Sequence, residues 1–302
     1  MSQTEKCGYV AIIGRPNVGK STLLNSLVGK KVSIISPKPQ TTRNQIIGIK
    51  TIGSTQIVFI DTPGLHKAEK RAMNRYMNRL ASSVIVDADV IIFMIEALRF
   101  TDDEEMILQK LKETQAPVIL VINKIDKIKD KSRLLPFIES IKTKFNFAEI
   151  VPMSVKKMDN VNLLEESIIE FLPEGPHFYP DEQVTDKNER FQIAELIREK
   201  LIMATEEELP YSTTVMVDSL EEDEKLTKIS AIIWVEREGQ KPIVIGKDGA
   251  LLKKIGTLAR KDIEKLLGKK VFLRLWVKVK SDWSDDERAL QSLGYDPTPT
   301  RE

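Results

Sequence analysis

The residues best suited to chemistry lie near the start of the chain, in the run GRPNVGKST at positions 14–22. The run fits G-x-x-x-x-G-K-[ST], in which glycines let successive backbone N–H groups surround a phosphate chain. Lys20 is placed to reach the β- and γ-phosphates, and the Ser21 hydroxyl can bind Mg²⁺. The predicted nucleotide-binding residues of this loop are Gly14, Arg15, Pro16, Asn17, Val18, Gly19, Lys20, Ser21 and Thr22.

A second motif, Asp61-Thr62-Pro63-Gly64, ends an apolar run at 56–60, about forty residues further on. A carboxylate at such a strand end can hold Mg²⁺ directly or through water. Gly64 has no side chain, so its N–H can come close to a γ-phosphate. The four residues are therefore predicted to bind nucleotide, with Asp61 as a metal ligand and Gly64 in a catalytic role.

The third motif, Asn123-Lys124-Ile125-Asp126, ends the apolar run 118–122 and identifies the base. The Asp126 carboxylate can accept two hydrogen bonds from N1–H and N2–H₂ of guanine. Adenine offers no such donor pair and would leave a buried acceptor unpaired. Lys124 can lie along the ring, and Asn123 can join this loop to the phosphate loop. The three motifs, in this order and spacing, predict a GTPase and not a kinase or an ATPase.

Ser154-Val155-Lys156 follows the next apolar run, where GTPases usually carry Ser-Ala-Lys and a backbone N–H meets guanine O6. Val155 departs from the usual Ala, which a backbone contact tolerates. Another polar segment, 36–44, has the composition of a mobile loop. A threonine there can close onto Mg²⁺ when the γ-phosphate is present. Thr41 and Thr42 both qualify, and their spacing does not choose between them.

Apolar strands alternate with helices through the first half, which predicts a doubly wound, mostly parallel sheet, the α/β fold of a P-loop GTPase domain. The predicted strands are 10–13, 45–51, 56–61, 90–95, 118–123 and 150–153. The predicted helices are 20–28, 69–86, 102–113, 134–145 and 162–171.

A proline-rich stretch at 172–180 predicts a linker, because proline fixes φ and removes a hydrogen-bond donor. We therefore expect a GTPase domain at 1–172, a linker at 173–188 and a second, smaller domain at 189–302. In the second domain the patterns predict a helix, two strands, a Gly-containing loop, a helix and a strand. The helices are 189–203 and 250–267, and the strands are 213–220, 228–235 and 270–279.

Gly246-Lys247-Asp248-Gly249 lies between a strand-like run at 243–245 and a helix, and fits the G-x-x-G loop that clamps single-stranded nucleotides in KH domains. The element order is that of the bacterial, type II KH domain. Residues 241–280 hold twelve Lys and Arg against three Asp and Glu, which favours a phosphate backbone as partner. The predicted RNA-binding residues are Ile243, Ile245, Gly246, Lys247, Asp248, Gly249, Leu251, Lys253 and Lys254; three of them, Ile243, Ile245 and Leu251, would form an apolar floor for bases. Trp234 and Trp276 are expected in the core.

The chain has 302 residues, more than a single hydrophobic core usually contains, which indicates two domains. Its net charge of +1 is the sum of basic and acidic stretches in different parts of the sequence. Residues 204–224 hold eight acids and no Lys or Arg. The single cysteine, Cys7, excludes an internal disulfide and is expected to be buried. No apolar run reaches membrane-spanning length and no signal core opens the sequence, so we expect a cytoplasmic protein.

Together, GRPNVGKS, PQTTR, DTPG, NKID and the 246–249 loop make the chain closely similar to the Era family of bacterial GTPases, over about residues 9–285. This resemblance implies GTP hydrolysis with Mg²⁺ and a role in assembly of the 30S ribosomal subunit. It implies binding to the 3′ end of small-subunit (16S-type) ribosomal RNA with a neighbouring helix, by a protein that is monomeric and in part peripheral to the inner membrane. It also implies Thr42 as the magnesium threonine, so the predicted metal ligands are Ser21, Thr42 and Asp61.

The same resemblance places an apolar residue, here Leu65, where other GTPases carry a water-orienting glutamine. Hydrolysis without a partner should then be slow. Related GTPases use a phosphate-loop asparagine to hold K⁺, and Asn17 occupies that position; a turn residue with no ion is the alternative. The predicted catalytic residues are Lys20, Thr42, Gly64 and Asn17.

Two other functions compete with this interpretation. A membrane-associated or cell-cycle signalling GTPase would use the second domain to bind protein or lipid, since anionic lipid is also attracted to a basic surface. The G-x-x-G loop in its fold context argues against it, because lipid binding does not need that loop. A P-loop kinase is disfavoured by NKID and by the lack of an acceptor-substrate motif.

Overall fold

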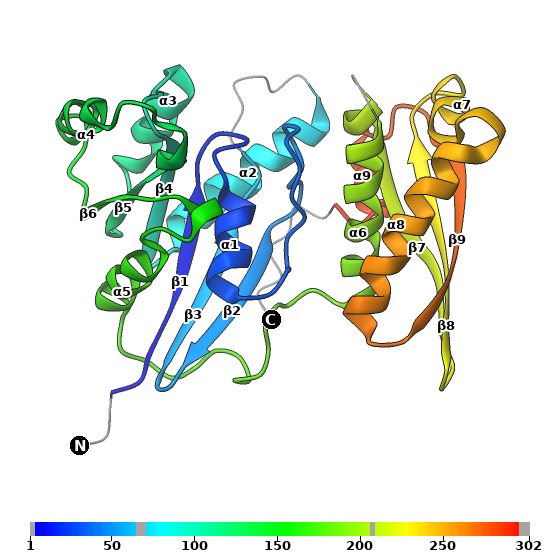
Figure 1. Cartoon of the computed structure of the whole chain (residues 1–302), viewed down its shortest axis with the longest axis horizontal. Helices are drawn as coiled ribbons and strands as arrows, with labels where there is room; N and C mark the ends of the chain where they lie inside the picture. The colour runs from blue at the N-terminus through cyan, green and yellow to red at the C-terminus, as the bar shows by residue number, and fades with distance from the viewer. Residues whose placement is uncertain (1–3, 65–70, 206–208, 296–302) are drawn as a thin grey trace. The chain divides into compact units, whose positions relative to one another are not determined.

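The computed structural model describes residues 4–64, 71–205 and 209–295. The chain divides into two compact units. Unit 1 comprises Met1–Ser33, Thr42–Glu69 and Asn74–Asp186; unit 2 comprises Ile34–Thr41, Lys70–Met73 and Lys187–Glu302. Each unit has its own sheet and its own hydrophobic core (Figure 1).

Unit 1 is built on a six-stranded sheet in the order β2-β3-β1-β4-β5-β6, in which only β2 runs antiparallel. The strands are β1 (Lys6–Ile13), β2 (Ile46–Ile52), β3 (Thr55–Asp61), β4 (Val90–Glu96), β5 (Val118–Asn123) and β6 (Glu149–Pro152). The central strands β4 and β5 are almost wholly buried, as expected for parallel strands covered on both faces. The predicted doubly wound, mostly parallel sheet is confirmed.

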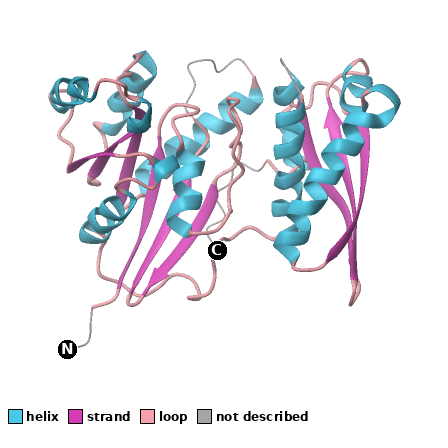
Figure 2. Cartoon of the chain, in the orientation of Figure 1, coloured by secondary structure: helices cyan, strands magenta, loops and turns pink. Residues whose placement is uncertain are grey.

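In the described part of unit 1, five α-helices flank this sheet (Figure 2). They are α1 (Lys20–Val28), α2 (Ala72–Asp87), α3 (Asp102–Leu111), α4 (Leu134–Lys142) and α5 (Val161–Phe171). Apolar side chains of α2, α3 and α4 share one core with β1, β4 and β5. This arrangement places the carboxyl ends of β1, β3, β4 and β5 at one edge of the sheet, where the predicted motifs begin.

Unit 2 has a three-stranded sheet in the order β7-β8-β9, with β8 and β9 parallel. Its elements are α6 (Glu189–Ala204), β7 (Thr213–Glu222), β8 (Leu226–Val235), α7 (Gln240–Ile245), α8 (Ala250–Leu267), β9 (Lys270–Val279) and α9 (Glu287–Ser292). Helices α6 and α8 pack on one face of the sheet, around buried residues such as Ile197, Ile233 and Ile255. The order is that of a type II KH domain, as predicted.

Two local predictions for unit 2 were wrong. The run 243–245, interpreted as strand-like, forms the end of helix α7, because a short apolar run does not distinguish a buried strand from a helical turn. Trp276 was expected in the core, but its side chain is 52% exposed. Alternate residues of a strand face opposite sides, and Val271 and Val277 face the core, so Trp276 faces outward. Cys7 is buried, as predicted.

Candidate functional site

The phosphate loop joins β1 to α1, and Lys20 lies at its centre. Its ammonium donates hydrogen bonds to the carbonyl oxygens of Gly14 (2.9 Å) and Arg15 (3.1 Å), and only 6% of the residue is exposed. Gly14 has a φ of +152° and a Cβ there would lie 2.4 Å from the Met94 carbonyl oxygen. The backbone therefore wraps closely around the position where phosphates bind in P-loop proteins.

Burial shifts the pKa of the two charged groups of this site in opposite directions. Desolvation lowers the pKa of Lys20 to about 8, against the attraction of Asp61. Desolvation also raises the pKa of Asp61, while Lys20 and hydroxyl hydrogen bonds act in the other direction. Burial disfavours the charged form of both groups, because each loses hydration. A bound group of opposite charge would stabilise the ammonium of Lys20 and the carboxylate of Asp61.

Side chains that bear oxygen atoms meet beside Lys20: those of Ser21, Thr42 and Asp61, with the Ser33 hydroxyl donating to Asp61 Oδ2 at 3.2 Å. The Ser21 hydroxyl donates to Asp61 Oδ2 at 2.6 Å, and lies 2.9 Å from the Thr42 hydroxyl. The Thr42 hydroxyl is 3.4 Å from Asp61 Oδ2. The other carboxylate oxygen of Asp61 is buried without a hydrogen-bond partner. Hydroxyl and carboxylate oxygens with an unsatisfied buried acceptor fit a hard cation such as Mg²⁺.

Thr41 and Thr42, which sequence reasoning alone did not separate, have different surroundings. The Thr41 hydroxyl is close to Ser36 (2.5 Å) and donates to the Lys38 carbonyl (2.7 Å), and its own carbonyl accepts from Arg198 of α6 at 2.5 Å within unit 2. Only Thr42 reaches Ser21 and Asp61, so only Thr42 belongs to the cation cluster.

The Asp61-Thr62-Pro63-Gly64 segment lies directly against the phosphate loop. A Cβ on Gly64 would approach Pro16 to 2.7–2.8 Å, including its backbone nitrogen. Thr62 donates to the Ile12 carbonyl at 3.1 Å, which fixes the start of the turn on β1. Glycine is thus required at 64 by space, and it leaves the backbone N–H close to the phosphate loop. Leu65, the predicted apolar replacement for glutamine, lies outside the described residues.

Asn123 joins the base loop to two other loops, as the sequence predicted. Its amide nitrogen donates to the Val18 carbonyl at 2.8 Å, and its amide oxygen accepts from the Val155 N–H at 3.1 Å. Gly19, with a φ of +113°, leaves room for this side chain, since a Cβ there would lie 2.5 Å from Asn123 Nδ2. The Val155 N–H, expected at guanine O6, is therefore also a partner of Asn123.

The base-reading carboxylate is exposed and oriented by a neighbour. The Ser154 hydroxyl donates to Asp126 Oδ1 at 2.6 Å, and this bond lowers the pKa of Asp126. Ser154 itself is fully buried at the end of β6. Asp126 is thus held ionised, with acceptor capacity left for the two guanine donors. Lys156, beside it, is exposed.

Sequence reasoning missed two acidic residues that support the site. Glu96, at the end of β4, accepts from Arg15 (2.9 Å) and from Lys124 (3.0 Å). Glu104, fully buried on α3, accepts from Arg15 at 2.5 Å. Burial alone would raise the pKa of Glu96, but Lys124 and Arg15 lower it overall. Because the Arg15 guanidinium is occupied by these carboxylates, Arg15 serves the phosphate loop through its backbone.

Lys124 also donates to the Asn17 carbonyl at 2.8 Å, from a left-handed conformation with a φ of +68°. The base loop and the phosphate loop are therefore linked twice, once by Asn123 and once by Lys124. Asn17 also has a positive φ, of +64°, a conformation that asparagine tolerates better than most residues. No sequence signal pointed to Glu96, because its place depends on strand register: Glu96 pairs with Asn123 across β4 and β5, which brings it beside Lys124.

The predicted RNA loop follows α7 and precedes α8. Gly246 has a φ of +76° and a Cβ there would lie 2.6 Å from Leu251 Cβ, whereas a Cβ on Gly249 would meet nothing within 4 Å. Lys247 and Asp248 between them are exposed. Gly246 is therefore required by packing, while Gly249, also at φ +76°, keeps one side of the loop open.

A groove continues from this loop between α8 and β9, with a volume of about 380 Å³. Its walls are Gly249, Leu252, Lys253, Gly256, Thr257, Arg260, Leu273 and Leu275. Of the predicted RNA-binding residues it contains Gly249 and Lys253. The apolar floor is formed by Leu252, Leu273 and Leu275, while Ile243, Ile245, Leu251 and Lys254 do not line it. Leu273 and Leu275 come from strand β9, which contributed none of the predicted RNA-binding residues.

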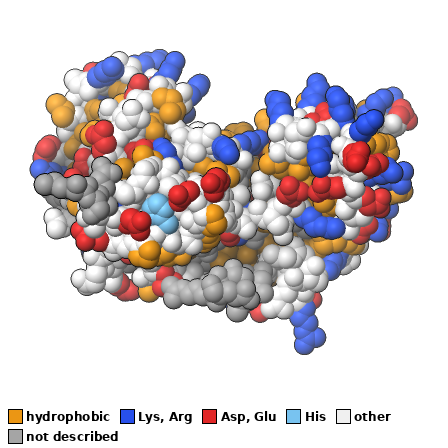
Figure 3. Space-filling model, turned by 90° about the horizontal axis from the view of Figure 1, so that it is seen from below, with side chains coloured by type: hydrophobic (Ala, Val, Ile, Leu, Met, Phe, Trp, Pro, Cys, Tyr) orange, Lys and Arg blue, Asp and Glu red, His pale blue; other side chains and the backbone are white. Residues whose placement is uncertain are grey.

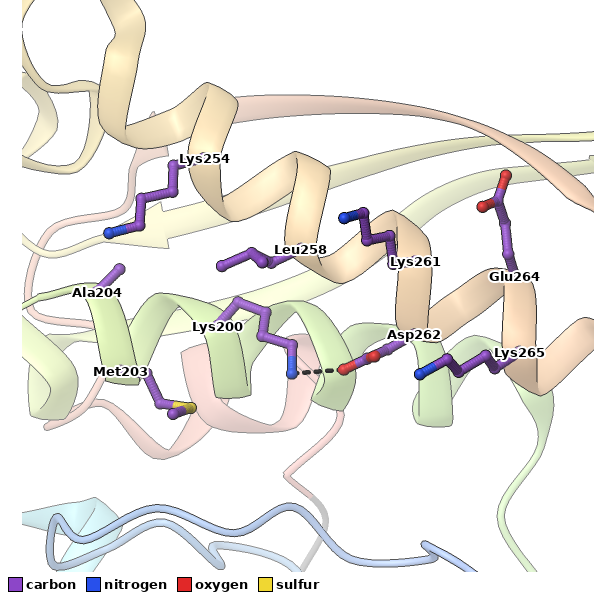
Figure 4. A pocket seen from close by; sticks show the side chains of 9 residues that line it. All are labelled: Lys200, Met203, Ala204, Lys254, Leu258, Lys261, Asp262, Glu264 and Lys265. Atoms are coloured by element: carbon purple, nitrogen blue, oxygen red, sulfur yellow. Dashed lines mark ion pairs between the residues drawn. The ribbon is translucent and has the colours of Figure 1, made fainter.

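A larger hollow of about 750 Å³ lies on the other side of α8, against α6 (Figure 4). The lysines around it are Lys200, Lys254, Lys261 and Lys265. Lys200 joins the two helices through an ion pair with Asp262 at 2.5 Å. Figure 3 shows basic side chains prominent over unit 2, among acidic ones. The lysines on this side of α8 add to the positive field near the groove.

Comparison with known proteins assigns both units. Residues 9–124 match the family model of the 50S ribosome-binding GTPases, and residues 208–284 match the model of the KH domain. The GTPase Era of Glaesserella parasuis is 55% identical over 294 residues, which are 97% of this chain and 98% of the relative. The chain belongs to the Era family of GTPases.

Two solved Era structures cover 96% of the chain at 44% identity and 99% of their own length. One is an Aquifex aeolicus Era variant bound to GDP and aluminium fluoride, with a TM-score of 0.92. The other is an Era in complex with MgGDPNP and nucleotides 1506–1542 of 16S ribosomal RNA, with a TM-score of 0.93. Membership of the Era family makes this chain a GTP-binding protein and a GTPase with a KH domain. Within the described ranges, no helix is long and apolar enough to cross a membrane.

Proposed function

We propose that this Era-family protein is a GTP-hydrolysing switch that acts in the cytoplasm on 30S ribosomal subunit assembly by binding the 3′ end of small-subunit ribosomal RNA. The observation that carries the RNA assignment is the open loop at 246–249, which leads into a groove of apolar and basic side chains. The groove fits unstacked bases on Leu252 and Leu275 with phosphates near Lys253 and Arg260. The complex of a related Era with 16S ribosomal RNA supports this choice of RNA.

In the GTPase unit, residues of this chain position GTP for attack by water. Lys20 neutralises charge on the β- and γ-phosphates, and Gly64 presents its N–H beside the phosphate loop. Ser21, Thr42 and Asp61 would hold Mg²⁺, which when bound neutralises charge that develops on the phosphates. With Leu65 in place of a glutamine, turnover without a partner is slow. Asn17 would hold K⁺, which when bound would neutralise charge that develops on the phosphates.

Coupling between nucleotide and RNA follows from the position of Thr42. A γ-phosphate with its cation orders Thr42, which belongs to unit 1. The preceding residue, Thr41, belongs to unit 2 and is held there by Arg198 of α6. Closure of the 36–44 loop therefore transmits the nucleotide state to the KH unit. RNA affinity should differ between GDP and a non-hydrolysable GTP analogue; equal affinities would rule out this coupling.

The test of RNA binding uses Gly249→Asp alone and together with Gly246→Asp. The single change adds a carboxylate in open space, at a φ of +76° that aspartate tolerates better than most residues. We therefore expect the fold to be retained at a modest cost in stability, while the phosphate backbone is repelled. We expect loss of binding to a single-stranded 16S 3′-end RNA with GTP affinity intact. Unchanged RNA affinity in the double variant would remove the site.

Vesicle co-sedimentation with anionic lipid, run beside RNA retention, tests the membrane-signalling alternative. If the chain is retained on vesicles through Lys254, Lys261 and Lys265 but shows no affinity for RNA, the second unit is a lipid-binding module. Sedimentation of the full chain in the same buffers tests the predicted monomer.

A further inference from the structure

Strand β9 carries two exposed aromatic side chains on the face of its sheet opposite helices α6 and α8. Phe272 is 50% exposed and Trp276 is 52% exposed. Among the large hydrophobic side chains that are exposed in the described parts of the chain, the only other aromatic one is Phe178, in unit 1. Exposing two aromatic rings on one strand of a small sheet is costly in water, which points to a bound partner.

Basic groups surround these two rings. Arg274 lies between them on the same strand, with its guanidinium carbon 5.8 Å from the Phe272 ring centre. Lys228 is the register partner of Phe272 on β8, and Lys278 lies 6.0 Å from the Trp234 ring centre. Lys228, Arg274 and Lys278 form no ion pair with any side chain that the structure describes.

Acidic groups are absent from the outward positions of β8 and β9. The outward residues of β8 are Lys228, Ser230, Ile232 and Trp234, paired with Phe272, Arg274, Trp276 and Lys278 of β9. On β7, the outward Glu221 faces Lys228 at the far end. At the opposite corner Thr214 is covered by Tyr295, with their hydroxyl oxygens 2.8 Å apart. The open part of the face is aromatic and positive, which selects an anionic partner with flat apolar groups.

The face is continuous with the groove beside the 246–249 loop. Strand β9 is the edge of the sheet, since the order is β7-β8-β9. Its inward residues Leu273 and Leu275 line the groove, and the alternate residues Phe272, Arg274 and Trp276 face the other side. Because the groove and the aromatic face lie on the two sides of the same edge strand, a chain that leaves the groove across β9 reaches this face.

We propose that the outward face of β9 is a second single-stranded RNA contact, on which bases beyond the groove stack on Phe272 and Trp276. Arg274 and Lys278 bind the phosphates between them. The proposal rests on the proposed function, in which the groove itself binds RNA. The rings are four residue steps apart along the strand, which is about 13 Å. They therefore hold two unstacked bases and not neighbours at the ~3.4 Å spacing of a stacked strand. Aromatic platforms on sheet faces bind bases of any sequence in this way.

The test compares RNA lengths on the full chain with GTP analogue bound. One probe is a four-nucleotide single strand sized for the groove; two longer probes add six nucleotides at its 5′ or its 3′ end. Phe272→Ala with Trp276→Ala should weaken binding of one longer probe at least tenfold, since each stacked ring contributes about five- to hundredfold. Affinity for the short probe should be unchanged.

Matched changes separate stacking from other effects. Phe272→Tyr with Trp276→Phe keeps the rings and should restore the affinity for the longer probe. Leu258→Ala, which trims an exposed apolar side chain on the far side of α8, should change none of the affinities. Arg274→Ala should lower the affinity for the longer probe and reduce the salt dependence of its binding.

The outcomes distinguish this inference from the proposed function. If Gly249→Asp abolishes binding of every probe while the alanine pair at β9 changes none, the groove is the whole RNA site and the inference is wrong. If the unaltered chain binds no probe, the proposed function fails as well. If the alanine pair weakens binding of the longer probe only when that probe is a duplex, the face binds a paired helix and the single-strand proposal is overturned.

Discussion

The Ser154 hydroxyl donates a 2.6 Å hydrogen bond to Oδ1 of Asp126, although the two residues lie on different loops. Ser154 is buried and Asp126 is exposed, so a fixed group orients the carboxylate that reads guanine. Base selection therefore depends on two loops held together by Asn123, and not on the NKID sequence alone.

The guanine assignment predicts an exchange of base preference. Asp126→Asn replaces one acceptor by a donor, which mismatches guanine and matches xanthine. We expect a loss of GTP affinity and a gain in xanthosine triphosphate affinity, each about tenfold or more, because a bidentate pair is broken in one and formed in the other. Competition against a fluorescent nucleotide measures both. A variant that loses both nucleotides equally would contradict the assignment.

The contact between Gly19 and Asn123 predicts a strong effect of one methyl group. Gly19→Ala places a Cβ 2.5 Å from Asn123 Nδ2 at a φ of +113°. We expect a loss of about 2–4 kcal/mol in unfolding free energy, from overpacking and backbone strain, with weaker GDP binding. Gly29→Ala is the matched control, since its φ is +75° and nothing lies within 4 Å. It should lose only about 1–2 kcal/mol; equal losses in the two variants would refute the contact.

The lowered pKa of Lys20, about 8, predicts a pH dependence of nucleotide binding. Phosphates bind the charged ammonium and stabilise it, so the bound pKa is higher than the free one. Affinity for GDP should be constant below pH 8 and fall about tenfold per pH unit above it. Calorimetric titration from pH 7 to 9 tests this. In Lys20→Arg the side chain stays charged, so any remaining fall of GDP affinity with pH measures the titration of guanine itself. If affinity falls equally in both proteins, Lys20 is not the group that titrates.

Glu96 is predicted to position two nucleotide loops at once. Glu96→Gln removes the charge that accepts from Arg15 and Lys124, two charge-assisted hydrogen bonds. GTP affinity should fall about tenfold, equivalent to roughly 1–2 kcal/mol. Glu105→Gln removes an exposed ion pair with Lys144 on the same unit and should change affinity by less than about twofold. Unaltered GTP affinity in Glu96→Gln would show that the two loops keep their positions without the Glu96 carboxylate.

The predicted role of Asn17 concerns the monovalent cation. Hydrolysis by the unaltered chain should be about tenfold faster in K⁺ than in Na⁺, because a cation beside the developing phosphate charge stabilises it. In Asn17→Ala the ratio of the two rates should approach one. Single-turnover hydrolysis at saturating Mg²⁺ gives the ratio directly. Identical rates in the two salts for the unaltered chain would leave Asn17 as a turn residue.

Contiguous motifs were sufficient to predict the GTPase and KH folds and the type of nucleotide. Lys20, Asp61 and Asp126 act through groups whose role follows from the residue type and its place at a strand end or loop. The helices around the sheet were predicted to within a few residues, because apolar periodicity follows directly from which face is buried. The run 243–245 was wrongly predicted as strand-like, because three apolar residues are too few to show a period.

The sequence by itself determined that GTP would be bound, because the phosphate and base motifs are local and their backbone geometry depends on glycine and on strand order. The family resemblance implied Thr42, and the structure adds the contacts that Thr42 makes with Ser21 and Asp61. Only the tertiary structure decided which acids hold Arg15 and which face of β9 Trp276 occupies. Those contacts join residues that are distant in sequence, and their partners depend on how strands and helices pack. The same alternation that turns Leu275 toward the helices exposes Trp276, and only the position of the covering helices shows which side of the strand is covered.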